Sequence, residues 1–170
     1  AAGFGVYRAS ELVKEFDNLL VITSFSKEYG LPSIRTGILF GSEKLMRKFH
    51  SIRFSYEINL FSQKFVEYII DNHNIISEYN QQVVKGREYF LKILDENNIK
   101  YNSDKSICVN VYFEDKNKKN FVVEQLENNK IYVKNYTEKM FDGIWSNFIT
   151  ITMAPEKTMK KFLEVFLLHY

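Results

Sequence analysis

The sequence predicts an α/β protein whose C-terminal part has an α+β order. Short apolar runs of strand length, such as residues 19–23, alternate with polar segments that contain Gly or Pro. Longer segments repeat apolar side chains at helical spacing, as between residues 76 and 94. With 170 residues, 45% of them hydrophobic, the chain is long enough for one domain, or for one domain and part of another.

The first third of the chain predicts two short strands between helices. The run at residues 19–23 is continuously apolar, which is typical of a strand covered on both faces. In chain order we expect a helix capped by Ser10, a strand, a polar loop, a second strand and a helix opened by Ser42, at residues 11–16, 19–23, 24–33, 35–40 and from 43 onward.

The remaining chain predicts two long helices followed by an α+β segment. Asn59 opens the first helix, and Asn97-Asn98 ends the second. Residues 116–119 predict an exposed turn because they are almost all lysine. In chain order we then expect a strand, a short helix, two strands and an amphipathic helix, at residues 107–113, 121–126, 131–133, 148–152 and 158–168.

The composition of the chain narrows the classes of partner and ligand that we expect. With 23 basic and 21 acidic residues the net charge is +2, so we expect neither a nucleic-acid nor a membrane partner. The single cysteine, Cys108, excludes an internal disulfide and favours the cytoplasm. His50, His73 and His169 lack metal-ligand spacing, so we expect no metal. The chain starts at Ala1 without Met, and we expect it to be part of a longer polypeptide.

Residues 19–37 carry the chemistry. A buried strand leads into a loop that holds Ser24, Ser26 and Lys27, and Arg35 follows. Ligand sites in open α/β sheets gather at the C-terminal ends of strands. A lysine amine can condense with an aldehyde, hydroxyl groups can donate to phosphate, and a guanidinium group can bind a phosphate dianion. The segment therefore predicts a clamp for a phosphorylated aldehyde.

The same residues carry a family resemblance. Ser-x-Ser-Lys, with Arg35 eight residues after Lys27 and Gly37 two further on, resembles class I/II aminotransferases of pyridoxal-phosphate (PLP) fold type I. The histidinol-phosphate aminotransferase-like branch is the most similar, and Asn59-x-x-x-Gln63 also matches the family. The resemblance implies pyridoxal 5'-phosphate as cofactor, Lys27 as the Schiff-base lysine, and Ser24, Ser26 and Arg35 as phosphate ligands.

The resemblance also implies a domain organisation. Residues 1–58 correspond to the end of the PLP-binding large domain, residues 59–94 to connecting long helices, and residues 95–170 to the small domain, whose short sheet is flanked by helices. The intact enzyme is expected to be a homodimer. Its partners are a small-molecule amino donor and a carbonyl acceptor, either a keto acid or a phosphorylated carbonyl.

Two departures from the family pattern matter. The family's partner for the pyridine nitrogen, its stacking aromatic residue and a second phosphate loop all precede the lysine, and only 26 residues do so here. We therefore expect the isolated chain not to be a competent enzyme. In addition, Phe148 stands where the family has a carboxylate-binding arginine. Either the substrate lacks an α-carboxylate, or Lys134 binds it, or the correspondence shifts; we interpret Phe148 as a core residue.

Three functions remain open from the sequence. The first is transamination by a longer protein through Lys27. The second keeps PLP but changes the reaction to decarboxylation or a lyase step, which the missing arginine allows. The third is a degenerate domain that serves only packing or dimerisation. Trp145 and Tyr136 are expected to pack rather than to bind a ligand.

Overall fold

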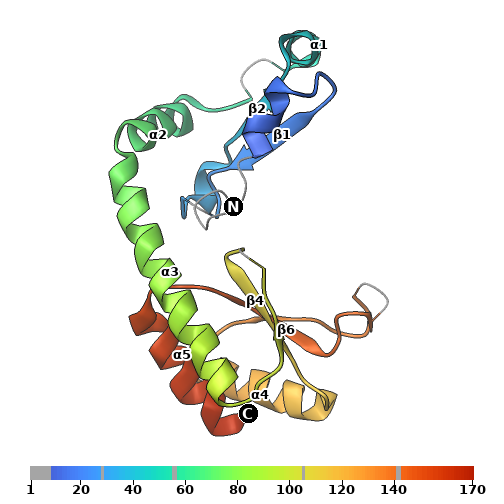
Figure 1. Ribbon diagram of the computed structural model, residues 1–170, viewed down its shortest axis with the longest axis vertical. Helices are drawn as coiled ribbons and strands as arrows, with labels where there is room; N and C mark the ends of the chain where they lie inside the picture. The colour runs from blue at the N-terminus through green and yellow to red at the C-terminus, as the bar shows by residue number, and fades with distance from the viewer. Residues whose placement is uncertain (1–8, 28, 55–56, 105, 141–142) are drawn as a thin grey trace. The chain divides into compact units, whose positions relative to one another are not determined.

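The computed structural model describes residues 9–27, 29–54, 57–104, 106–140 and 143–170, and it divides into two compact units, residues 1–78 and 79–170 (Figure 1). Each unit is described here by itself. The predicted class, a mixed α/β chain, is confirmed. The predicted boundaries near residues 58 and 94 concern the family's domains and stay predictions.

The first unit contains a two-stranded antiparallel sheet. Strand β1 (Leu20–Ser24) pairs with β2 (Gly37–Gly41), with Leu20 opposite Gly41 and Ser24 opposite Gly37. In the described part of this unit, the 3₁₀ helices are η2 (Ala9–Lys14), before β1, and η3 (Pro32–Ile34), between the strands; the α-helices α1 (Glu43–Ile52) and α2 (Leu60–Asp71) follow β2. The strands and α-helices were predicted; the helix expected at residues 11–16 is a 3₁₀ turn.

One prediction about β1 was wrong. The apolar run suggested a strand covered on both faces, yet the side chain of Ile22 is 78% exposed. The physical reason is the pairing: a two-stranded antiparallel ribbon leaves one face open unless another layer covers it. Several large apolar side chains of α1, α2 and the segment between them are also exposed, namely Ile52, Phe54, Leu60 and Phe61.

Capping explains where the helices of the first unit begin. The Asn59 side chain accepts a hydrogen bond from the Ser62 backbone N–H at 2.8 Å, which satisfies one free donor at the start of α2. Ser42 precedes α1, as predicted, but its hydroxyl donates to the Asp17 carbonyl at 2.8 Å instead of capping the helix. That bond ties the start of α1 to the segment before β1.

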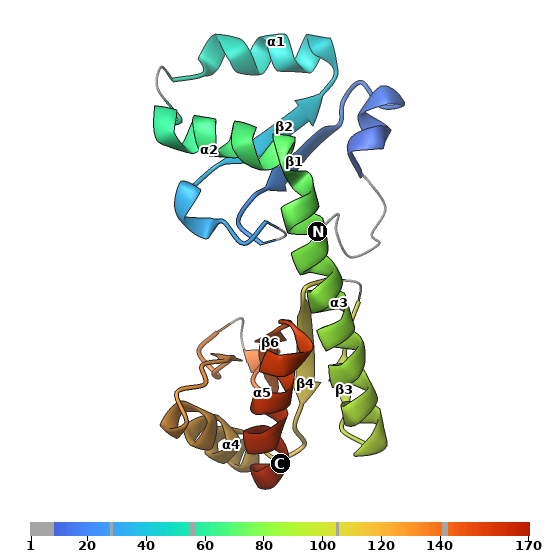
Figure 2. The ribbon, with the colours of Figure 1, turned by 90° about the vertical axis from the view of Figure 1, so that its left-hand side faces the viewer.

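The second unit is a four-stranded antiparallel sheet with helices. The order of strands is β3 (Tyr101–Asn102), β4 (Cys108–Tyr112), β6 (Phe148–Thr152) and β5 (Lys134–Asn135). Helices α4 (Lys116–Asn128) and α5 (Glu156–His169), and the part of α3 (His73–Glu96) from residue 79 onward, flank this sheet on one face (Figure 2).

Strand alternation builds the core of the second unit. Val109 and Val111 on β4 and Ile149 and Ile151 on β6 are buried, whereas the residues between them are only partly covered. Phe90 on α3 meets Phe162 on α5, with ring centroids 5.8 Å apart. Burying one such side chain contributes about 1.5–3 kcal/mol. The core therefore depends on the helices remaining on this face.

Two predictions in the second unit were wrong in detail. Residues 116–119 form the first turn of α4, because Asp115 caps the helix by accepting the Asn117 N–H at 2.8 Å. A strand was expected at residues 131–133, but the strand in this region is β5, at Lys134–Asn135. The reason is that Ile131 N–H bonds back to the Leu126 carbonyl at 2.9 Å in the turn that ends α4.

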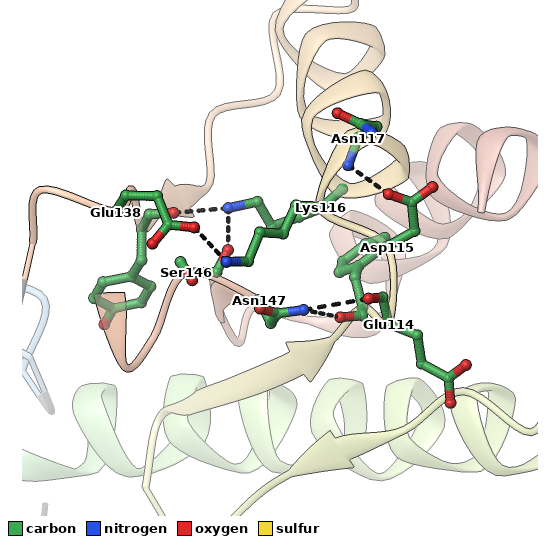
Figure 3. A network of polar contacts seen from close by, with 10 residues as sticks. Glu114, Asp115, Lys116, Asn117, Glu138, Ser146 and Asn147 are labelled. Atoms are coloured by element: carbon green, nitrogen blue, oxygen red, sulfur yellow. Dashed lines mark hydrogen bonds and ion pairs between the residues drawn. The ribbon is translucent and has the colours of Figure 1, made fainter. Parts of the chain in front are cut away.

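Polar contacts hold the segment between β5 and β6 against the start of α4. Lys119 is only 3% exposed, and its ammonium group donates to the carbonyls of Tyr136 at 2.7 Å and Ser146 at 2.5 Å. Burial lowers the pKa of Lys119. Lys116 pairs with Glu138, and Asn147 Nδ2 donates to the Phe113 carbonyl at 2.7 Å (Figure 3).

We predict that Gly86→Ala destabilises the second unit. Alanine normally stabilises a helix interior by about 1 kcal/mol relative to glycine. At this buried position, however, a Cβ would clash with the Ala154 carbonyl oxygen and lie 2.8 Å from the Glu156 nitrogen. We expect a net loss of about 1–3 kcal/mol, measured as a lower urea midpoint. The control is Gln82→Ala at an exposed position of α3; equal midpoints for the two variants would contradict the close contact.

We predict that the Glu138 carboxyl titrates below its ordinary pKa of 4.5, because Lys116 donates a hydrogen bond to it and attracts its charge. The stabilisation is then present above pH 4.5 and is lost as the pH falls through the lowered pKa. A ¹³C NMR titration of the carboxyl group measures this. Lys116→Met should return the midpoint toward 4.5; an unchanged midpoint in that variant would rule out the pair as the cause.

Candidate functional site

The four predicted site residues lie on one segment, the connection between β1 and β2. Ser24 ends β1, and Ser26, Lys27 and Arg35 follow before β2 begins. At the base of this connection, the Phe25 N–H donates a hydrogen bond to the Thr36 carbonyl at 3.3 Å. The Leu31 N–H donates to the Phe25 carbonyl at 3.0 Å, so the loop folds back on itself.

Phe25 anchors this loop. Its side chain is 2% exposed, and its ring lies 4.7 Å from that of Tyr29. Ile34 and Thr36 are also buried, and the Thr36 hydroxyl donates to the Ile34 carbonyl at 2.9 Å. Because these residues point inward, the side chains of Lys27 and Arg35 remain exposed. The loop is thus a scaffold that presents its polar groups outward.

The serines and the lysine are ordered through the backbone. Ser24 Oγ accepts the Ser26 N–H at 3.1 Å, which leaves the Ser24 hydroxyl proton available to a ligand. The Lys27 carbonyl accepts the Gly30 N–H at 3.1 Å in a turn where Gly30 has φ 63°. Glycine adopts that left-handed conformation without the steric penalty of a side chain. The turn therefore sets where the Lys27 side chain leaves the loop.

Arg35 has an unusual backbone. Its φ is 50°, in the left-handed region that a residue with a side chain rarely adopts, and its Nη1 donates to the Pro32 carbonyl at 3.0 Å. Two residues later, a Cβ on Gly37 would lie 2.7 Å from the Thr23 carbonyl oxygen. Glycine is therefore required at position 37 for β1 and β2 to pair. The glycine two residues after Arg35 is therefore explained by the close approach of the Thr23 carbonyl.

The donor set of this loop fits the phosphate and the aldehyde of PLP. One ammonium group, one guanidinium group with donors to spare, and two hydroxyls can neutralise and hydrogen-bond a phosphate dianion. The primary amine can also react with a carbonyl carbon. Among the described residues, no group of three His, Cys, Asp or Glu side chains gathers in a way that could hold a metal ion.

Phe148 lies in the second unit, within an aromatic cluster. Its ring is 5.2 Å from Tyr112 and 5.3 Å from Trp145, and Trp145 is 6.1 Å from Tyr136. The predicted core residue is therefore half-buried rather than fully buried, while the predicted packing of Trp145 and Tyr136 is confirmed. Lys134 is exposed, and its ammonium group lies 4.8 Å from the centre of the Tyr136 ring.

Sequence reasoning missed two residues. Phe25 is the variable position of Ser-x-Ser-Lys, and its apolar character between two serines was the signal that it anchors the loop. Lys119 stands in a lysine-rich run, and no sequence signal distinguishes it from its exposed neighbours.

A hollow of 1110 Å³ lies beside β2 and α1 and is lined by Gly37, Phe49 and Phe54 among others, but by none of the four predicted site residues.

In the described part of the chain, no helix is both long enough and apolar enough to span a membrane.

Comparison with known proteins covers nearly the whole chain. Residues 2–166 match the family model of aminotransferase class I and II. A curated relative, the histidinol-phosphate aminotransferase of Thermotoga neapolitana, is 31% identical over 157 residues, which is 92% of this chain and 44% of the relative. The chain thus spans less than half the length of this relative.

Solved structures share the fold at lower identity. A putative histidinol-phosphate aminotransferase from Erwinia carotovora has a TM-score of 0.83 at 12% identity, over 98% of this chain and 48% of that one. A decarboxylase from Sulfurospirillum multivorans has a TM-score of 0.78 at 18% identity, over 94% of this chain and 46% of that one. These likenesses show the fold alone. The family match over residues 2–166 shows that the chain belongs to the class I and II aminotransferases.

Proposed function

We propose that this chain contributes the cofactor-binding lysine and part of the phosphate site of a PLP-dependent aminotransferase. One observation carries the proposal: Ser24, Ser26, Lys27 and Arg35 share a single loop that Phe25 anchors and that Gly37 allows to close. Family membership supports the same function. The relative from Thermotoga neapolitana suggests a histidinol-phosphate aminotransferase-like protein.

Each residue of the loop has a separate task in this proposal. Lys27 Nζ would hold the cofactor by condensing with its aldehyde carbon, with water as the leaving group, and, once the amino donor has displaced it, would move the proton of the 1,3-transfer within the bound substrate and cofactor. Arg35 and the two serine hydroxyls orient the cofactor through its phosphate. When bound, PLP supplies the electron sink for the reaction.

We further propose that these residues are half of a site. The chain covers 44% of the Thermotoga neapolitana relative, and the first unit exposes large apolar side chains such as Ile22 and Phe54. An apolar surface of this kind fits a protein layer that covers it. In the longer enzyme we expect a homodimer in the cytoplasm, and we expect the isolated chain to retain PLP only weakly.

Decarboxylation is the second candidate, and Phe148 is the observation that favours it. No guanidinium group occupies this position, and the surrounding cluster is aromatic, so a substrate carboxylate lacks its usual partner here. The fold is shared with a decarboxylase. Measuring carbon dioxide release against amino transfer with a panel of amino acids separates the two reactions, and a purely packing domain would show neither.

We predict that borohydride reduction after incubation with PLP attaches the cofactor to Lys27. The measurement is peptide mapping by mass spectrometry, on a form of the protein that spans the full length of its relatives. Lys27→Ala should abolish the label, whereas Lys44→Ala, at an exposed position of α1, should leave it unchanged. The 170-residue chain should give weak labelling. A label spread evenly over exposed lysines would contradict the assignment.

We predict that Arg35→Lys lowers PLP affinity about tenfold, because an ammonium group cannot replace the planar fork on a phosphate. Arg35→Gly should lower it at least as much, even though glycine relieves the backbone at φ 50°. This second variant separates the guanidinium group from the strain. Titration of PLP absorbance measures both, with Arg47→Lys on exposed α1 as control; unchanged affinity in both Arg35 variants would remove Arg35 from the site.

A further inference from the structure

Lys119 is a buried cation that the cofactor loop does not use. It lies on α4, and its ammonium group reaches the two ends of the segment between β5 and β6, at the carbonyls of Tyr136 and Ser146. These acceptors are ten residues apart in the chain. A single ammonium group therefore fixes both ends of this segment, residues 136–147, to the same helix.

An apolar side chain of the same length could not do this. Removing the ammonium group would take away the donor that it supplies to the buried Ser146 carbonyl and to the partly buried Tyr136 carbonyl, which is costly where the site is desolvated. Burial of the charge is itself unfavourable unless it is hydrogen-bonded, and burial lowers the pKa of Lys119 accordingly. The two short bonds offset that cost. The contact is thus a specific one rather than a by-product of packing.

The fixed segment carries an aromatic series. Trp145 directly precedes Ser146, and Phe148 follows two residues later. The rings of Tyr136, Trp145, Phe148 and Tyr112 follow one another at 6.1, 5.3 and 5.2 Å. Lys119 thus binds the backbone of Tyr136 and of the residue after Trp145, next to both of these rings.

We propose that Lys119 is a positioning residue: its ammonium group holds the backbone of Tyr136 and of Ser146 so that Trp145 is set against Tyr136 and Phe148. The role of this cluster in substrate recognition rests on the proposed function, because the family resemblance puts a carboxylate-binding arginine where Phe148 stands. The positioning itself does not depend on any cofactor.

The test uses Trp145, the only tryptophan of the chain, as a reporter. In the 170-residue chain, Lys119→Met keeps the length of the side chain and removes its donors. We expect unchanged far-UV circular dichroism, a shift of Trp145 emission to longer wavelength and roughly a doubling of the acrylamide quenching constant, because local release exposes a side chain without global unfolding.

The matched control is Lys118→Met, which removes a charge from the adjacent exposed position of α4. Its Trp145 emission and quenching should equal those of the unchanged chain. A folded Lys119→Met variant with an unchanged Trp145 signal would overturn the proposal. Since PLP is absent from these measurements, failure of the positioning role is distinguishable from failure of the proposed aminotransferase function.

A second measurement covers the case in which Lys119→Met does not fold. In the unchanged chain, the Lys119 ammonium protons should exchange slowly enough with water to give a resolved ¹⁵N NMR signal with cross-peaks to Tyr136 and Ser146. Exposed Lys118 should give none. Absence of a protected Lys119 signal would overturn the proposal without any substitution.

Discussion

Burial of one face of the β4–β6 pair is the constraint on which the second unit depends. Val109, Val111 and Ile149 point toward the helices, so the residues between them must point to the opposite face. That alternation brings Phe148 beside Tyr112. The contact between Phe148 and Tyr112 is therefore a consequence of core formation on the other side of the sheet. In our proposal, Lys119 positions only the remaining rings of the cluster, those of Trp145 and Tyr136.

The first unit is held together by different contacts. The loop between β1 and β2 is held by contacts within a dozen residues, among them the backbone bonds of Phe25 and the Thr36 hydroxyl bond to the Ile34 carbonyl. Among the described residues of this unit, in contrast, several of the larger apolar side chains are exposed. The lysine loop can thus keep its local shape in a chain that spans less than half of a relative. Local order and catalytic completeness are separate properties here.

Much of the fold followed from periodicity, and the misses have physical causes. The strand at Phe148–Thr152 was predicted with the bounds that the structure has, because its alternation reflects a single buried face. The start of α4 was missed because a lysine-rich run looks solvated, and only tertiary contacts bury Lys119. The apolar run of β1 suggested two covered faces, since hydrophobicity alone does not reveal how many strands pair.

The residues of the candidate site could be proposed from the sequence, but their backbone geometry could not. The residues Ser24, Ser26, Lys27 and Arg35 could be named as candidates from their chemistry and from the family resemblance. The positive φ of Arg35 and the close approach at Gly37 could not, because both depend on how β1 and β2 pair.

The unequal strand lengths bear on self-association. In the four-stranded sheet, both outer strands, β3 and β5, are only two residues long, so this sheet offers another chain almost no backbone to pair with. In the described part of the first unit, β1 and β2 each keep a five-residue edge that no other strand covers. An open edge beside an exposed isoleucine is a template for intermolecular strand addition. In the 170-residue chain, strand pairing between copies would therefore involve the β1–β2 ribbon rather than the four-stranded sheet.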